Sequence, residues 1–106
     1  SIGKRQQTVT PTQALYLMNS EFVHQQSRGL AGRILYHSQS LDDRIRWAFE
    51  VTQGQVPEAD DLKEARLFIE SYLKQLSVDG TDGDEQSVWS AFSRVLLTSN
   101  KFLFVD

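Results

Sequence analysis

The chain has no cysteine, and its uninterrupted apolar runs are only a few residues long. The first absence excludes disulfides, thiolate metal ligands, cysteine nucleophiles and haem attached through a Cys-x-x-Cys-His motif. The second excludes a membrane-spanning helix, which needs about 20 apolar residues. The segment SIGKRQQTVTP is basic but is not followed by an apolar stretch, so it is not a signal peptide, and any targeting segment would lie upstream.

The sequence also lacks an excess of positive charge, because 11 Lys and Arg stand against 14 Asp and Glu, for a net charge of -3. This balance argues against nucleic acid as a partner, since binding to phosphate backbones depends on clustered basic residues. With 106 residues, 40% of them hydrophobic and 24% charged, the composition is that of one globular domain. We expect a single domain over residues 1–106, with residues 1–9 as a flexible arm.

Only two prolines occur, Pro11 and Pro57, and no segment alternates between apolar and polar residues as a strand does. Apolar residues instead recur at spacings of three and four, which predicts helices over about 11–18, 20–37, 41–53, 58–77 and 88–100. Ser20 and Ser40 are the expected N-caps of the second and third helices, with Ser40 and Asp43 as a variant of the capping box, and Gly54 is an expected C-cap. The last helix is expected to end at Asn100.

The predicted fold is therefore all-α, an irregular bundle of about five helices with a docked apolar C-terminal tail, KFLFVD. Four apolar residues in a row, Phe102 to Val105, are too hydrophobic to remain in water. The positions expected to face the core are Leu15, Met18, Phe22, Val23, Gln26, Leu30, Ala31, Ile34, Leu35, Leu41, Ile45, Ala48, Phe49, Thr52, Leu62, Ala65, Ile69, Tyr72, Leu73, Leu76, Val88, Trp89, Phe92, Val95, Leu96 and Ser99.

No residue set predicts a catalytic, cofactor or metal site. The acidic loop at 79–85 resembles a calcium loop, but the sixth and twelfth positions are Asp84 and Ser90 instead of Gly and Glu. We expect a solvated loop, with a weak cation site as the alternative. His24 and His37 are thirteen residues apart, which is not the spacing of a helical metal pair. A dyad of His24 with Glu21 has no visible pocket, so an exposed polar histidine is expected.

Two pairs of adjacent aspartates and the two tryptophans could each have a structural or a functional role. The pairs Asp42–Asp43 and Asp60–Asp61 lie in first helical turns, where capping and the helix dipole explain them. Trp89 falls on the core stripe of the last helix and is expected to be a packing anchor. Trp47 lies outside the apolar stripe of its helix, so it is a possible interaction surface, with partial burial against a neighbouring helix or the arm as the other interpretation.

Two longer strings, TVTPTQALYLMNSEFVHQQSRGLAGRIL and VWSAFSRVLLTSNKFLFVD, resemble the signatures of the domain-of-unknown-function family numbered 1553. The resemblance implies the C-terminal domain of large planctomycete-type surface or cytochrome-like proteins. Gln53 and Gln55 depart from its pattern, which more often has an aliphatic residue and an arginine there. The positions that carry the resemblance are Pro11, Gln13, Ala14, Leu15, Asn19, Ser20, Phe22, Val23, Trp89, Leu96, Leu97, Ser99, Asn100, Phe102, Leu103, Val105 and Asp106.

The resemblance implies the C-terminal fragment of a longer, extracytoplasmic protein, periplasmic or on the cell surface, in many relatives with a haem-binding domain upstream. It implies no activity for this segment. Our hypothesis is a non-catalytic helical domain that docks onto upstream domains of the same polypeptide, without nucleic acid, cofactor or membrane insertion, through a face containing the arm and Trp47. The alternative is an accessory wall of an enzyme active site whose catalytic groups lie upstream, in carbohydrate or redox metabolism.

Overall fold

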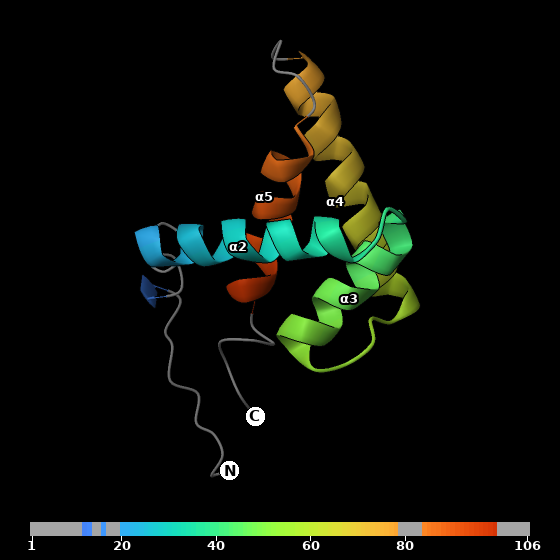
Figure 1. The fold of residues 1–106 in the computed structure, drawn as a ribbon, viewed down its shortest axis with the longest axis horizontal. Helices are drawn as coiled ribbons and strands as arrows, with labels where there is room; N and C mark the ends of the chain where they lie inside the picture. Colours follow the sequence, from blue (N-terminus) through green and yellow to red (C-terminus); the bar gives the residue numbers. More distant parts are fainter. Residues whose placement is uncertain (1–11, 14–15, 17–19, 79–83, 100–106) are drawn as a thin grey trace.

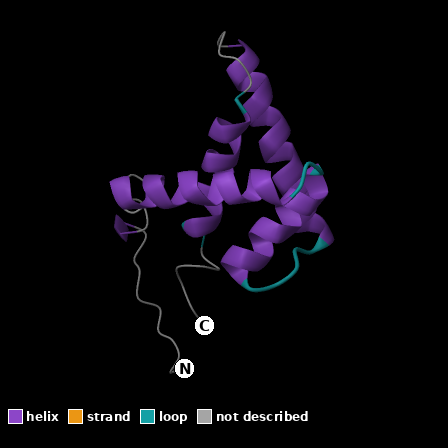
Figure 2. Cartoon of the chain, viewed as in Figure 1, coloured by secondary structure: helices purple, strands orange, loops and turns teal. Residues whose placement is uncertain are grey.

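The computed structural model describes residues 12–13, 16, 20–78 and 84–99, and all regular secondary structure in these ranges is helical (Figures 1 and 2). The helices are α2 (Glu21–His37), α3 (Leu41–Gln53), α4 (Ala59–Val78) and α5 (Glu85–Leu97). The all-α class is thus confirmed for this part of the chain. Thr12, Gln13 and Tyr16 are helical as well, within the expected first helix. The rest of that helix, the arm at 1–9 and the tail at 100–106 lie outside the described residues.

The expected helix ends at Ser20, Ser40 and Gly54 are confirmed. The hydroxyl of Ser20 accepts the backbone N–H of Val23 at 3.1 Å, and that of Ser40 accepts the N–H of Asp43 at 3.3 Å. Each bond satisfies one of the donors that a helix N-terminus leaves free. Gly54 ends α3 in the left-handed conformation, with φ of 75°, and donates its N–H to the carbonyl of Glu50.

Two of the helices form an antiparallel hairpin, and the other two pack on it. Figure 1 shows α4 rising to one end of the molecule and α5 returning beside it, while α2 crosses α5 at a steep angle. The core between them centres on Trp89, which is 2% exposed and meets Phe92 edge to face at a ring distance of 5.6 Å. Ile34 of α2, Ile45 of α3 and Ile69 of α4 complete this cluster from the other helices.

Three of the expected core positions are wrong, and one helix ends earlier than expected. Phe22 is 66% exposed, Val95 is 41% exposed, and Gln26 is also on the surface. The buried face of α2 runs through Val23, Ser27, Leu30, Ala31 and Ile34, so Phe22 and Gln26 point away from α5. Two fully buried residues, Ser27 and Ser93, were not among the expected core positions.

The end of α5 at Leu97, instead of Asn100, follows from competing hydrogen bonds. The carbonyl of Leu96 accepts the N–H and the hydroxyl of Ser99, and also the side-chain amide of Gln53 at 3.1 Å. These donors take the place of the next helical turn and satisfy a carbonyl that the helix end leaves free. Gln53 thereby joins the end of α3 to the end of α5.

Candidate interaction surface

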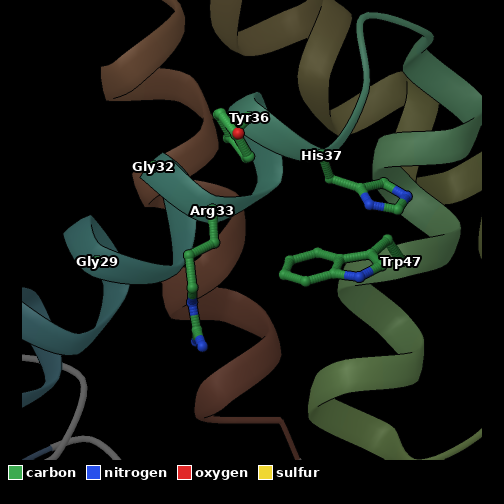
Figure 3. A pocket seen from close by; sticks show the side chains of 6 residues that line it. All are labelled: Gly29, Gly32, Arg33, Tyr36, His37 and Trp47. Carbon is green, nitrogen blue, oxygen red and sulfur yellow. The ribbon is translucent and has the colours of Figure 1, made fainter.

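An open groove of about 540 Å³ lies between the C-terminal half of α2 and the middle of α3 (Figure 3). Helix α2 supplies most of its lining, and α3 supplies one side chain, that of Trp47. The lining residues are Gly29, Gly32, Arg33, Tyr36, His37 and Trp47. We refer to this feature as the Trp47 groove.

One wall of the Trp47 groove is a pair of stacked rings. The imidazole of His37 lies over the indole of Trp47, with ring centroids 5.0 Å apart and planes inclined by 19° (Figure 3). His37 ends α2, and a short turn in which Ser38 accepts the N–H of Ser40 leads directly into α3. The turn therefore brings together two residues that are ten positions apart. Trp47 is half-buried and packs on the core, as its partial-burial interpretation expected.

The floor of the groove is bare helix backbone at Gly29 and Gly32. A Cβ atom added at either position would have no heavy atom within 4 Å, so nothing in the described chain requires glycine there. A glycine inside a helix is less favourable than alanine by about 1 kcal/mol. The helix is thus weakened at two positions without a packing reason inside this chain, and the result is a smooth surface beside an aromatic wall.

Exposed aromatic residues continue the same face of α2. Tyr36 is 93% exposed and Phe22 is 66% exposed. Phe22, Gly29 and Tyr36 are spaced by seven residues, so they lie within about 40° of one another around the helix. Arg33 lies on this face as well and forms no salt bridge with another described residue. An exposed aromatic face with a positive charge suits a protein partner, because Tyr, Trp and Arg dominate binding energies at interfaces.

Several of the other residues considered from the sequence have structural partners. The Glu21 carboxylate pairs with Arg28 at 3.4 Å, while His24 is half-buried and not fully exposed as expected. Asp42 accepts two hydrogen bonds from Arg66 on α4, each of 2.8 Å. The sequence interpretation of Asp42, as a residue that caps a helix or complements its dipole, did not include this partner. Asp61 accepts the N–H of Glu58 at the start of α4.

The described end of the acidic loop is also used in the fold. Asp84 is the N-cap of α5, where it accepts the N–H of Gln86 at 3.0 Å, and Glu85 pairs with Arg44. Residues 79–83 lie outside the described part, so the cation alternative stays a prediction. In the described ranges, no three His, Asp or Glu side chains lie together as metal ligands would. None of the helices described in this structure has the length and apolarity needed to cross a membrane.

The fold and this groove define a small helical domain with an aromatic surface available for contact. Among protein-family models, one described as "Protein of unknown function (DUF1553)", with the short name PSD1, matches residues 1–69. The match covers more than half of the 106 residues, and the chain belongs to this family. It includes α2, α3 and the groove between them, and the second of the two resembling strings lies beyond it. No curated protein and no solved structure gave a match.

Sequence reasoning identified one of the residues of this surface and missed the others. Trp47 was singled out because it lies off its apolar stripe. Tyr36 was not considered. The seven-residue spacing of Phe22, Gly29 and Tyr36 is the signal that could have revealed the face, because a helix surface that combines glycine with exposed aromatics is not explained by solubility.

Proposed function

We propose that this chain is a non-catalytic docking domain of a larger protein and that it binds the upstream part of the same polypeptide through the Trp47 groove. The observation that carries the proposal is the pairing of two glycines that no internal contact requires with aromatic side chains exposed beside them. Such a face allows a partner chain to approach the backbone of α2 closely while Tyr36 and Trp47 cover it from the sides.

The charge of the groove indicates the chemistry of the partner segment. The charged residue in its lining is Arg33, whereas the whole chain has a net charge of -3. A partner segment with an acidic side chain and an apolar or aromatic side chain would complement this surface. We propose this pattern for the docking segment.

The setting of the domain is part of the same proposal. The resemblance to planctomycete-type surface or cytochrome-like proteins supports an extracytoplasmic location and a longer parent protein. We also propose that the short helix before Ser20 and the apolar tail belong to the folded domain, which would complete the bundle of about five helices.

The proposal is tested by variants that separate binding from stability. Tyr36→Ala should weaken binding of the upstream polypeptide to this chain by about tenfold, about 1.4 kcal/mol, because an exposed tyrosine contributes to a contact and not to the core. Gly32→Ala should also weaken binding, yet it should raise the melting temperature, because alanine is the better helix former. Titration calorimetry measures the affinity, and thermal melting followed by circular dichroism measures the stability.

The matched control is Leu67→Ala, which removes an exposed apolar side chain from α4, outside the groove. It should leave both affinity and melting temperature nearly unchanged. In the complex, the Trp47 indole should be protected from iodide quenching, and Trp89 contributes little to the quenching because it is buried. Equal affinity for Tyr36→Ala and the unchanged chain would contradict the proposal. Loss of an enzymatic activity of the complex without loss of affinity would instead support the accessory role at an active site.

A further inference from the structure

A second groove lies on another side of the bundle, between α3, α4 and α5. Its floor is apolar and includes Phe49 of α3, Phe68 of α4 and Phe92 and Val95 of α5, and its rim carries Asp61 and Glu64. The volume is about 220 Å³, which is below the range of about 300–1,000 Å³ typical of small-molecule sites. A groove of this size and polarity suits inserted apolar side chains better than a free ligand.

The position of this groove in the fold brings it next to the end of α5. The lining of the groove joins the last turn of α5, through Val95 and Leu96, to the first turns of α4, where Asp61 and Glu64 form the acidic rim. Val95 lines the groove four residues before Ser99, the last described residue. The seven residues that follow can span up to about 24 Å when extended, so they can reach across a groove that their own helix helps to form.

The composition of residues 100–106 matches the groove in polarity and in charge. Phe102, Leu103, Phe104 and Val105 are four consecutive apolar residues, and Lys101 precedes them. The rim of the groove is acidic, and Glu64 has no salt-bridge partner among the described residues. An ammonium group at the rim and apolar side chains on the floor would satisfy both parts of the surface.

The exposure of Val95 is a further reason to expect that another segment of chain covers this groove. Its place in the sequence pattern predicts a core residue, yet its side chain is 41% exposed and faces the groove. A hydrophobic residue on the core stripe of a helix is explained when a further segment of chain covers it.

We propose that residues 100–106 fold back against the end of α5 and place their apolar side chains in the groove between α3, α4 and α5. This location of the tail is independent of the partner at the Trp47 groove, which lies between α2 and α3. The tail therefore completes the core of its own domain and leaves the Trp47 groove open for docking.

A double-mutant cycle in the full chain tests the contact. Val95→Asp should lower the melting temperature by about 5–10 °C more than Val51→Asp does, because a carboxylate in the groove would oppose an apolar tail. Val51 is the matched control, since it is 46% exposed and does not line this groove. When Phe102 and Phe104 are both replaced by serine, the excess effect of Val95→Asp should disappear, because the tail no longer occupies the groove.

Nuclear magnetic resonance gives the location directly. The two serine substitutions should shift the methyl signals of Val95 and Ala65, and they should leave the indole N–H signal of Trp47 in place. An excess effect of Val95→Asp that persists without the two phenylalanines would overturn the proposal. Movement of the Trp47 signal, without movement at Val95, would also overturn it, because the tail would then lie in the other groove.

Discussion

At the scale of single residues, four buried or half-buried hydroxyls behave in two different ways. Thr52 and Thr98 donate to the carbonyl four residues earlier, Thr52 to Ala48 at 2.8 Å and Thr98 to Arg94 at 2.7 Å. Ser27 and Ser93 are fully buried, and their hydroxyl oxygens have no hydrogen-bond partner among the residues that the structure describes. A buried hydroxyl without a partner loses its bonds to water and costs about 1–3 kcal/mol.

Replacing either serine with alanine should therefore leave the protein equally stable or more stable. We expect Ser27→Ala and Ser93→Ala to raise the free energy of unfolding by up to about 1 kcal/mol each, since the lost packing of one oxygen offsets part of the gain. Urea unfolding measures this change. Thr52→Val is the control and should cost about 1 kcal/mol, because it removes a made hydrogen bond. A loss of stability in both serine variants would show that their hydroxyls are bonded in solution.

At the scale of helices, polar side chains set how α3 lies against its neighbours. Asp42 at the start of α3 holds Arg66 of α4 through two hydrogen bonds of 2.8 Å, and Gln53 at its end holds the last turn of α5. The hydrogen bonds from Arg66, assisted by its charge, lower the pKa of Asp42, while the carboxylate raises the pKa of Arg66. Both side chains of this pair are partly exposed, so solvent screens the interaction and its contribution is modest.

The lowered pKa of Asp42 predicts how the pair responds to acid. A carboxylate whose pKa is lower in the folded state stabilises the fold above its unfolded pKa of about 3.9, and this contribution is lost as the pH falls through the folded value. Asp42→Asn should lower the melting temperature at pH 7, and the difference from the unchanged protein should shrink as the pH falls below about 4.

The matched control for this prediction is Glu50→Gln. Glu50 also lies on α3, and its exposed carboxylate forms no ion pair with a described residue. Its replacement should change the melting temperature little at pH 7. A constant difference between Asp42→Asn and the unchanged protein from pH 7 to pH 2 would rule out the ion pair as the cause.

At the scale of the whole molecule, Trp89 and Arg44 connect helices that are distant in sequence. The Arg44 side chain is buried, lies over the Trp89 ring at 5.8 Å, donates to the carbonyl of Ser38 at the end of α2, and pairs with Glu85 at the start of α5. Contacts of a cation with an indole face and of a buried guanidinium with a carbonyl are both favourable. This cluster joins three of the described helices.

Trp89→Ala should consequently affect the whole fold. We expect a loss of about 3–5 kcal/mol in the free energy of unfolding, the usual cost of emptying a core aromatic site, out of a total of about 5–15 kcal/mol for a domain. Chemical denaturation followed by circular dichroism measures this loss. Val78→Ala, at an exposed position on α4, is the comparison and should cost little. A cost below about 1 kcal/mol for Trp89→Ala would contradict the central position of this residue.

Local chemistry in the sequence was enough for the class of the fold and for most helix boundaries. Ser20, Ser40 and Gly54 mark helix ends because capping bonds involve residues at most four positions apart. Ile45, Ile69 and Trp89 are buried because each lies on the apolar stripe of its own helix. The spacing of three and four residues that forms such a stripe can be read from the sequence.

Contacts between helices were decided by the tertiary structure. The partners of Asp42, Arg44 and Gln53 are on other helices, and the His37–Trp47 stack depends on how a short turn orients two helices. The exposure of Phe22 and Val95 has the same origin, because periodicity gives the apolar side of a helix but not which part of that side a neighbour covers. The physical reason is range: capping and amphipathic spacing act within a few residues. The rotation of a helix and the pairing of polar side chains instead depend on packing among segments that are distant in sequence, as in the hydrogen bond between Gln86 and Arg28, which are 58 residues apart.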